Sequence, residues 1–252
     1  MARRILVTGA ASGLGAALAR AFRACGDDVL ATDRVAHDVD LALDITSDAD
    51  WAAALAAVEE RWGGLDVLVN NAGVAGGGRL DVATIDEWQW IFEINLFGMV
   101  RGLRTFTPLF KRQGSGQLVN VASLAGLVHP AGMASYNAVK AAVVALTETA
   151  GHELAGHGVR AMAVCPSYFR TNLMESIQGS DPAVGQVVAR LIERSTTTAD
   201  DIAAEVLEGI DHGVELLLPD EAARAAWLLK SQDRTAYDAL MRAQAAKLEE
   251  AT

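Results

Sequence analysis

The chain has 252 residues, of which 51% are hydrophobic and 21% charged, enough for one large α/β domain or two small ones. Its net charge of −11 argues against a nucleic-acid partner, because binding to phosphates requires clustered basic residues. The two cysteines, Cys25 and Cys165, lie in apolar segments and the five histidines are scattered, so neither a disulfide scaffold nor a metal site is expected.

The first residues, MARRILVTGAASG, contain only the apolar run Ile5 to Val7 before a glycine-rich turn. This run is too short for a signal peptide. No apolar run approaches the roughly 20 residues that a membrane-spanning helix needs. We therefore expect a cytoplasmic protein without a membrane span.

Segments typical of strands and of helices alternate along the chain, without an internal repeat or a composition break. Strands are predicted at residues 4–9, 27–33, 40–45, 65–73, 117–123, 158–166 and 214–219. Amphipathic helices are predicted between them, and Thr84 with Glu87 forms a capping box that opens a long helix running toward Pro108. This alternation predicts one doubly wound, parallel α/β domain over residues 1–252. Within it, residues 167–197 are a predicted substrate-binding lid, and residues 220–252 a charged helical tail.

A glycine-rich turn, TGAASGLG, joins the first predicted strand to the first helix. Glycines allow a tight turn and a close pyrophosphate, and the helix N-terminus supplies free N–H groups. Asp33 ends the second strand about 20 residues beyond Gly13, where a ribose-binding carboxylate is expected. The turn alone could be an ordinary connection, but together these features predict a dinucleotide site. The predicted contacts here are Gly9, Ser12, Gly13, Leu14, Gly15, Asp33 and Arg34.

Asp33 favours NAD over NADP. A carboxylate near a 2′-phosphate meets repulsion on the order of 1 kcal/mol in water and about 4 kcal/mol at a protein surface. Arg34 follows directly and could bind that phosphate, so NADP is the less favoured alternative.

Tyr136 and Lys140 are four residues apart, so they lie on one face of a predicted helix. A nearby ammonium favours a phenolate, and we expect it to lower the pKa of Tyr136 and create a proton donor and acceptor usable near neutrality. Ser123 ends the apolar run QLVNVAS, where a rigid hydroxyl could hold a substrate oxygen. The spacing Tyr-x-x-x-Lys also occurs by chance in many helices.

Asn95 falls on an apolar helical stripe with Phe92, Met99, Leu103 and Phe106. A buried amide must find hydrogen-bond partners or cost stability. The pattern alone leaves three interpretations open: a satisfied structural amide, a local helix distortion and a catalytic amide.

Together these motifs resemble the short-chain dehydrogenase/reductase family, from the first strand through Leu218. The resemblance is carried by TGAASGLG, Asp33, Asp44-Ile45, Asn70-Asn71-Ala72-Gly73, Asn95, Ser123, Tyr136-x-x-x-Lys140 and a proline-started loop with Thr171. It implies a Rossmann-like fold of about seven strands and an oxidoreductase that transfers a hydride between NAD(P) and a secondary alcohol or ketone. It excludes a methyltransferase, which would not need the serine, tyrosine and lysine in register.

The resemblance also implies roles for individual residues. Tyr136 would be the acid/base, Lys140 would lower its pKa and bind the nicotinamide ribose, and Ser123 would hold the substrate oxygen. Asn95 would position a water in a proton relay through Lys140. The further implied cofactor contacts are Asp44 and Ile45 at the adenine, Asn71, Ala72 and Gly73 beside the adenosine, Pro166, and Thr171 at the carboxamide.

The chain departs from the family at three points. Ser167 follows Pro166 where glycine is usual, Ala161-Met162 replaces a common asparagine, and a charged helical tail replaces the usual glycine-containing C-terminus. The familiar tetramer uses that C-terminus, so we expect a homodimer through the long helices rather than a tetramer.

The substrate pocket is predicted to be mainly apolar, for a cyclic, steroid-like or fatty-acyl ketone. Its candidate wall residues are Leu124, His129, Met133, Tyr168, Phe169 and Met174, and the predicted substrate contacts are Ser123, Tyr136, Tyr168 and Phe169. His129 either hydrogen-bonds the substrate or is simply exposed. Two alternatives to an NAD-linked dehydrogenase stay open: an NADP-dependent ketoreductase of the oxoacyl carrier-protein reductase type, and a non-catalytic dinucleotide-binding protein.

Overall fold

Seven parallel strands form the central sheet in residues 2–170 and 179–250, the residues that the computed structural model describes. Their order is β3-β2-β1-β4-β5-β6-β7. The order reverses between β1 and β4, where open α/β sheets bind ligands. This topology confirms the predicted doubly wound, Rossmann-like fold. The strands are β1 (Arg4–Thr8), β2 (Asp28–Asp33), β3 (Leu41–Ala42), β4 (Val67–Asn70), β5 (Gly116–Val121), β6 (Val159–Val164) and β7 (Leu216–Leu217).

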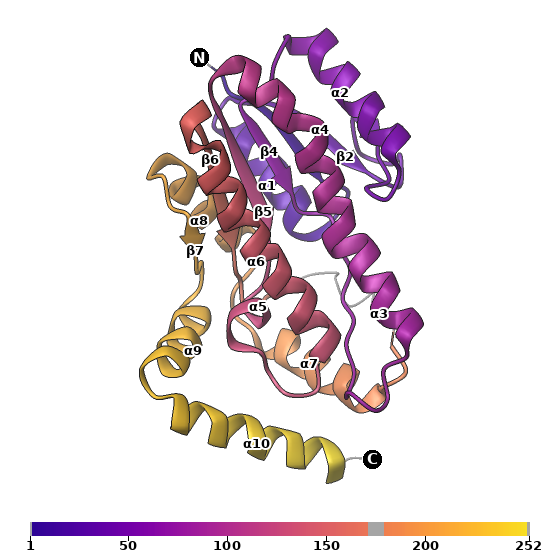
Figure 1. Cartoon of the computed structure of the whole chain (residues 1–252), viewed down its shortest axis with the longest axis vertical. Coiled ribbons are helices and arrows are strands. Elements are labelled where there is room, and N and C mark those ends of the chain that lie inside the picture. Colours follow the sequence, from indigo (N-terminus) through magenta and orange to yellow (C-terminus); the bar gives the residue numbers. More distant parts are fainter. Residues whose placement is uncertain (1, 171–178, 251–252) are drawn as a thin grey trace.

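The helices flank the sheet and extend past its carboxyl edge (Figure 1). None of those in the described ranges combines the length and apolarity needed to cross a membrane. The α-helices are α1 (Gly13–Ala24), α2 (Asp48–Trp62), α3 (Ile85–Phe92), α4 (Gly98–Gln113), α5 (Ala125–Val128), α6 (Ala134–Leu154), α7 (Pro182–Arg194), α8 (Ala199–Asp211), α9 (Glu221–Gln232) and α10 (Arg234–Glu250). A π-helix, η1 (Glu93–Phe97), and a 3-10 helix, η2 (Ala155–His157), complete the set.

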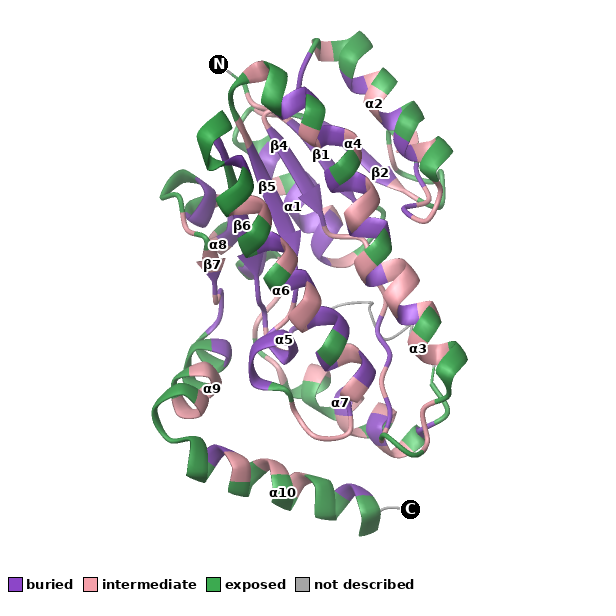
Figure 2. Ribbon diagram, in the orientation of Figure 1, coloured by how far each residue is buried: buried purple, intermediate pink, exposed green. Residues whose placement is uncertain are grey.

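Side chains alternate between the two faces along each central strand, and each face has its own helical cover. Ile5 and Val7 of β1 belong to the core that α1 and α8 complete. Leu6 of β1 belongs to a second core with Trp51 of α2 and Phe106 of α4. Figure 2 shows the strands as buried and the outer helix faces as exposed. The result is a three-layer domain with one hydrophobic core on each side of the sheet.

The start of α3 has the predicted capping box, and the start of α2 is capped by a side chain as well. The Ser47 hydroxyl accepts a hydrogen bond from the backbone N–H of Asp50 at the start of α2. Thr84 and Glu87 form both bonds of the capping box at α3. The long helix predicted after Thr84 is interrupted, because η1 separates α3 from α4, and Pro108 lies inside α4.

The C-terminal tail forms α9 and α10, which lie beyond the carboxyl ends of the strands (Figure 1). The Tyr237 hydroxyl on α10 donates to the carbonyl oxygen of Val128 at 2.6 Å. Leu248, near the end of α10, belongs to a small core with Met133 and Val184. The tail is therefore packed against the region around α5 and α7.

Candidate functional site

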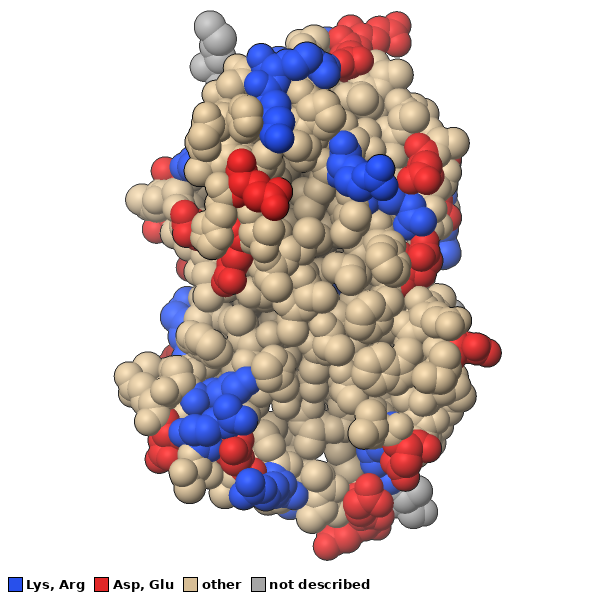
Figure 3. Space-filling model, viewed as in Figure 1, with Lys and Arg blue, Asp and Glu red and all other residues tan. Residues whose placement is uncertain are grey.

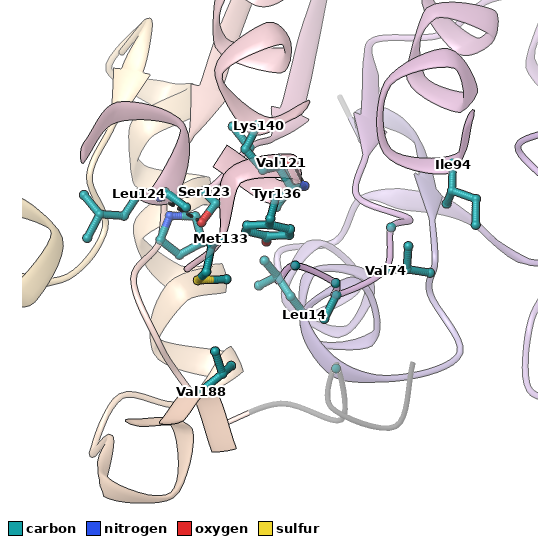
Figure 4. A pocket seen from close by; sticks show the side chains of 18 of the residues that line it. Leu14, Val74, Ile94, Val121, Ser123, Leu124, Met133, Tyr136, Lys140 and Val188 are labelled. Carbon is teal, nitrogen blue, oxygen red and sulfur yellow. Dashed lines mark hydrogen bonds between the residues drawn. The ribbon is translucent and has the colours of Figure 1, made fainter. Parts of the chain in front are cut away.

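A cavity of about 1340 Å³ opens along the carboxyl edge of the sheet. Its lining joins the turn after β1, the ends of β2 and β4, the loop after β5, the start of α6 and parts of α7, α9 and α10. Figure 4 shows Leu14, Ser123, Tyr136 and Lys140 around this space. The predicted site residues that line it are Gly9, Ser12, Gly13, Leu14, Asp33, Arg34, Asp44, Ile45, Asn71, Ala72, Gly73, Ser123, Tyr136, Lys140, Pro166, Tyr168 and Phe169.

The turn between β1 and α1 has two positions where only glycine fits. Gly9 has a φ of 68°, in the left-handed region, and a Cβ there would lie 2.8 Å from Ala72 Cα. A Cβ on Gly15 would lie 2.0 Å from the carbonyl oxygen of Gly9. Asn71 Nδ2 donates to the carbonyl oxygens of Thr8 at 2.9 Å and Gly9 at 3.3 Å. The segment after β4 therefore fixes the turn by direct contact.

Two carboxylates line the cavity beside this turn. Asp33, at the end of β2, accepts hydrogen bonds from the backbone N–H groups of Ala11 at 3.1 Å and Val35 at 3.4 Å. Asp44 accepts from the backbone N–H of Thr46 at 2.9 Å and from its hydroxyl at 2.7 Å. Both carboxylates are partly exposed, so a ligand in the cavity can reach them.

A buried chain of polar side chains fixes α6 relative to the sheet. Asn70 Nδ2 of β4 donates to Asn120 Oδ1 of β5 at 2.9 Å, and Asn120 Nδ2 donates to Thr147 Oγ1 of α6 at 3.0 Å. Thr147 Oγ1 donates in turn to a carbonyl one turn earlier in the helix. These bonds set the position from which Tyr136 and Lys140 reach the cavity.

Lys140 lies under Tyr136 and is anchored to the sheet. Its Nζ donates to the carbonyl oxygen of Val121 at 3.0 Å and lies 5.8 Å from the centre of the Tyr136 ring. Desolvation lowers the pKa of Lys140 to about 8. Desolvation raises the pKa of Tyr136 to about 12, and a hydrogen bond with Ser123 opposes that rise. The predicted lowering of the Tyr136 pKa is therefore wrong for this arrangement, because burial removes the phenolate from water and this outweighs the hydrogen bond with Ser123.

Asn95 lies in η1 and is 1% exposed. Its Oδ1 accepts from the backbone N–H of Val74 at 2.8 Å, and its Nδ2 donates to the Val74 carbonyl oxygen at 3.0 Å. A Cβ on Gly73 would lie 2.7 Å from Asn95 Oδ1, so the segment after β4 packs directly on this amide. Two of the three interpretations of Asn95 are therefore confirmed: it is a hydrogen-bonded structural amide, and it lies in a distorted part of the helix. Asn95 stands behind the cavity lining, and its proton relay stays a prediction.

Ser167, in the place of the expected glycine, is held by the start of α9. Its backbone N–H donates to Asp220 Oδ2 at 2.9 Å and its hydroxyl donates to Asp220 Oδ1 at 2.7 Å. Asp220 also accepts from the backbone N–H of Ala223 as the N-cap of α9. Ser167 is not among the described non-glycine residues with positive φ, so glycine is not required here. The loop after Pro166 is thereby tied to the C-terminal tail.

Some of the predicted wall residues of the substrate pocket do line the cavity. Leu124, Met133, Tyr168 and Phe169 line the cavity. His129 does not: it is exposed, with a φ of 57°, and its Nδ1 lies 2.7 Å from Lys230 Nζ of α9. Its predicted substrate contact is therefore wrong and its exposure confirmed. Thr171 and Met174 lie outside the described residues.

A family model of the short chain dehydrogenases matches residues 3–181 of this chain. The chain belongs to the short-chain dehydrogenase/reductase family. The 2-(R)-hydroxypropyl-CoM dehydrogenase of Xanthobacter autotrophicus is 34% identical to it over 226 residues, covering 82% of this chain and 90% of that protein. As a member of the family, this short-chain dehydrogenase/reductase is an oxidoreductase that acts on CH–OH groups with a nicotinamide cofactor.

Two solved structures of the family resemble this one and hold different cofactors. A short chain dehydrogenase/reductase from Burkholderia phymatum in complex with NAD has a TM-score of 0.85 and 29% identity, covering 92% of this chain and 94% of that one. A short chain dehydrogenase from Burkholderia cenocepacia in complex with NADP has a TM-score of 0.81 and 28% identity, covering 95% and 97%. The family likeness therefore leaves the choice between NAD and NADP to the residues of this chain.

The start of α1 fits the pyrophosphate of a nicotinamide dinucleotide. Ser12 is the N-cap, yet among the described residues no side chain caps this first turn and no acidic residue lies in it. The starts of α2, α3, α7, α8 and α9 are all capped by Ser, Thr or Asp side chains. Free N–H groups and a positive helix end therefore face the cavity at α1, next to the glycine turn, which suits an anion.

An ion pair that the sequence patterns did not predict fixes the start of α7. Arg79 Nε donates to Asp181 Oδ2 at 2.8 Å, and the Asp181 side chain is fully buried. Asp181 is also the N-cap of α7, directly before Pro182. An aspartate before a proline-started helix was a readable capping signal, but nothing in the sequence pointed to Arg79 as its partner. The lid function of residues 167–197 stays a prediction.

Proposed function

We propose that this short-chain dehydrogenase/reductase transfers a hydride between a nicotinamide dinucleotide, with NAD favoured, and a secondary alcohol or its ketone, with Tyr136 as the acid/base. One observation carries the proposal: Gly9, Asp33, Tyr136 and Lys140 line the same cavity. The Xanthobacter relative is named for a 2-hydroxypropyl group, which is a secondary alcohol, and this supports the substrate class.

In this proposal Tyr136 Oη accepts the hydroxyl proton during oxidation and returns it during reduction. Ser123 Oγ holds the substrate oxygen, and its hydrogen bond stabilises the phenolate. Lys140 uses one donor on Val121 and has others for the nicotinamide ribose. When bound, the nicotinamide ring accepts or supplies the hydride. Moving the proton as the hydride leaves avoids a full alkoxide in a desolvated site.

The remaining cofactor contacts belong to the same proposal. Asp44 and Ile45 hold the adenine, the segment from Asn71 to Gly73 lies beside the adenosine, and Thr171 binds the carboxamide. Asp44 and Ile45 line the cavity on the side of the glycine turn, which supports their role.

Alcohol oxidation is expected to accelerate as pH rises. The proton acceptor is the phenolate, whose population falls as pH drops below the Tyr136 pKa of about 12. The rise should become less steep above a pH of about 8, where Lys140 loses its charge. Ser123→Ala should move the profile to higher pH, because it removes a bond that lowers the phenol pKa. The profile of kcat/KM against pH measures this, and a flat wild-type profile would contradict it.

The preference for NAD is expected to depend on Asp33. Asp33→Asn removes a charge that repels a 2′-phosphate by about 1 to 4 kcal/mol, so the ratio of NADPH to NADH affinity should rise at least about fivefold. The amide oxygen can still accept from Ala11, which keeps the turn intact. Fluorescence titration of both cofactors measures the ratio, and the exposed Asp38→Asn is the control. An unchanged ratio would show that Asp33 does not select the cofactor.

One observation favours a second candidate, an NADP-dependent ketoreductase. Arg34 is exposed, directly follows Asp33 and lines the same cavity, so it could bind a 2′-phosphate. Arg34→Ala would then weaken NADPH binding strongly and NADH binding little. Equally small losses of NADPH and NADH affinity in Arg34→Ala would contradict an NADP-dependent ketoreductase.

The proposed assembly is a homodimer through α4 and α6. The central part of the face in Figure 3, which these helices cross in Figure 1, carries few charged side chains. Phe97, next to α4, is 48% exposed, which supports a covered surface there. Sedimentation is expected to give twice the chain mass of 26.5 kDa and a shift toward monomer for Phe97→Glu. A wild-type monomer or tetramer would contradict the proposal.

The experiment that tests the proposed function is a panel of secondary alcohols and ketones, assayed at about 340 nm, where reduced nicotinamide absorbs, with NAD and with NADP. The expected result is turnover of several members with NAD preferred. Tight dinucleotide binding without any turnover would instead support a non-catalytic dinucleotide-binding protein.

A further inference from the structure

Apolar side chains from three separate parts of the chain close the end of the cavity beyond Tyr136, which we call the substrate chamber. Figure 4 shows Met133 and Val188 on the side of Tyr136 away from Val74 and Ile94. The chamber is lined by Val128 and Met133 between β5 and α6, Val184 and Val188 on α7, and Tyr237 and Met241 on α10.

The C-terminal wall of the chamber, formed by α9 and α10, is anchored by hydrogen bonds from its polar side chains to the backbone of α5. The Tyr237 hydroxyl donates to Val128 at 2.6 Å, and Lys230 Nζ donates to the carbonyl oxygen of Leu127 at 2.5 Å. At the far end of α10, a Cβ on Gly132 would lie 2.6 Å from Leu248 Cδ1. Three points of contact therefore hold α9 and α10 against the chamber, and what they present to it is hydrocarbon.

The basic side chains near the chamber are already bonded to other groups of the protein or lie at the other end of the cavity. Arg34 and Lys140 are the basic residues among the described cavity lining; Arg34 follows β2 at the dinucleotide end, and Lys140 is bonded to Val121. Arg79 is paired with the buried carboxylate of Asp181. Lys230 is engaged outside the chamber, so none of these cations faces a substrate there.

The six side chains that line the chamber are uncharged, so they offer no cation to an anionic substrate. Burying an unpaired carboxylate or sulfonate in such surroundings is strongly unfavourable.

We infer that the substrate chamber takes uncharged, largely hydrocarbon secondary alcohols and ketones and rejects those with a carboxylate or sulfonate, and that Met241 of α10 determines this selectivity. The inference rests on the proposed function, because it names the substrate class of the same site. Met241 is half-buried and reaches the chamber from a helix that follows the last strand, where its side chain can be exchanged without touching the catalytic groups.

The test uses two substrates that differ only at one end. Octan-2-ol ends in a methyl group, and 7-hydroxyoctanoate carries a carboxylate in its place. With NAD, kcat/KM for octan-2-ol should exceed that for 7-hydroxyoctanoate by on the order of 100-fold. Methyl 7-hydroxyoctanoate should behave like the alcohol, because the ester removes the charge and adds only one methyl group. Equal kcat/KM values for alcohol and carboxylate would overturn the inference.

Variants of α10 locate the selectivity. Met241→Arg should raise the ratio of carboxylate to alcohol turnover at least about tenfold by supplying a partner cation. Met241→Trp should lower the ratio of octan-2-ol to propan-2-ol turnover at least about tenfold by filling the chamber. Ala245→Trp adds the same ring on the exposed face of α10 and should leave both ratios unchanged. Unchanged ratios in both Met241 variants would overturn the assignment of Met241.

A binding measurement separates this inference from the proposed function. A ketone and oxidised NAD cannot react with each other, so calorimetry with NAD present measures chamber affinity without turnover. Octan-2-one should bind at least about tenfold more tightly than 7-oxooctanoate. Selective binding without turnover of octan-2-ol would contradict the proposed reaction and support the chamber. Turnover with equal binding of the two ketones would contradict the chamber and support the reaction.

Discussion

Replacing Tyr136 by phenylalanine is expected to lower kcat by at least about 100-fold and to leave dinucleotide affinity within about twofold of wild type. The substitution removes only the hydroxyl that exchanges the proton, while the ring stays above Lys140 at the same place in α6. The measurement is steady-state turnover of the best alcohol of the panel, together with fluorescence titration of NADH.

A matched removal of another hydroxyl is the control for this variant. Tyr168→Phe deletes a phenol from the same cavity, where its hydroxyl contacts Met133 Sδ at 3.5 Å. Its loss of turnover should stay below about tenfold, since only substrate fit is affected. Equal losses in both variants, or an unchanged Tyr136→Phe enzyme, would show that Tyr136 is not the proton-transferring group.

Gly15→Ala is expected to weaken NADH binding by at least about tenfold and to cost about 1 to 3 kcal/mol of folding stability. The added methyl group would lie 2.0 Å from the carbonyl oxygen of Gly9, so the turn must move away from its position against Asn71. Because the N–H groups at the start of α1 are fixed by that turn, the displacement misaligns the site for the pyrophosphate.

A second glycine provides the control for this prediction. A Cβ added at Gly156 would meet no atom within 4 Å, and Gly156 is not among the glycines with positive φ. Gly156→Ala should therefore leave both NADH affinity and the melting temperature close to wild type. Fluorescence titration and thermal unfolding measure the two effects. Wild-type NADH affinity in Gly15→Ala would contradict the assignment of the turn as the pyrophosphate site.

The sheet and its helices could be predicted from local patterns. Each central strand is a short apolar run, and helices such as α2 and α3 begin at capping residues that the sequence displays. For η1, the pattern around Asn95 predicted a helix distortion only as one of three interpretations. The distortion depends on Asn95 bonding to Val74 from another element, 21 residues away.

That the glycine turn, Asp33 and the Tyr136–Lys140 pair meet at one cavity was also predictable, because each motif lies within a single segment of the sequence. The pKa of Tyr136 was not. Its direction depends on how completely the surrounding chain removes the phenol from water, which is a property of the packed structure. The position of Ser123 at the cavity could be predicted from the end of its strand. Its effect on the pKa of Tyr136 could not, because the hydrogen bond between them depends on the packed structure.

The packing of α9 and α10 against the cavity was the feature least predictable from sequence patterns. The tail was predicted to be helical, but its contact with the cavity depends on Tyr237 meeting Val128, 109 residues earlier in the chain. Likewise, the serine at position 167 is explained only by Asp220, 53 residues later. Such long-range contacts leave no periodic signal in one sequence.

The most direct test of the central claim is a crystal structure of the protein with NADH. We expect the pyrophosphate to lie against the N–H groups at the start of α1. The nicotinamide C4 should face a substrate position that lies about 3 to 3.5 Å from it and within hydrogen-bond reach of Tyr136 Oη and Ser123 Oγ. A dinucleotide bound elsewhere, or a nicotinamide ring directed away from Tyr136, would contradict the account.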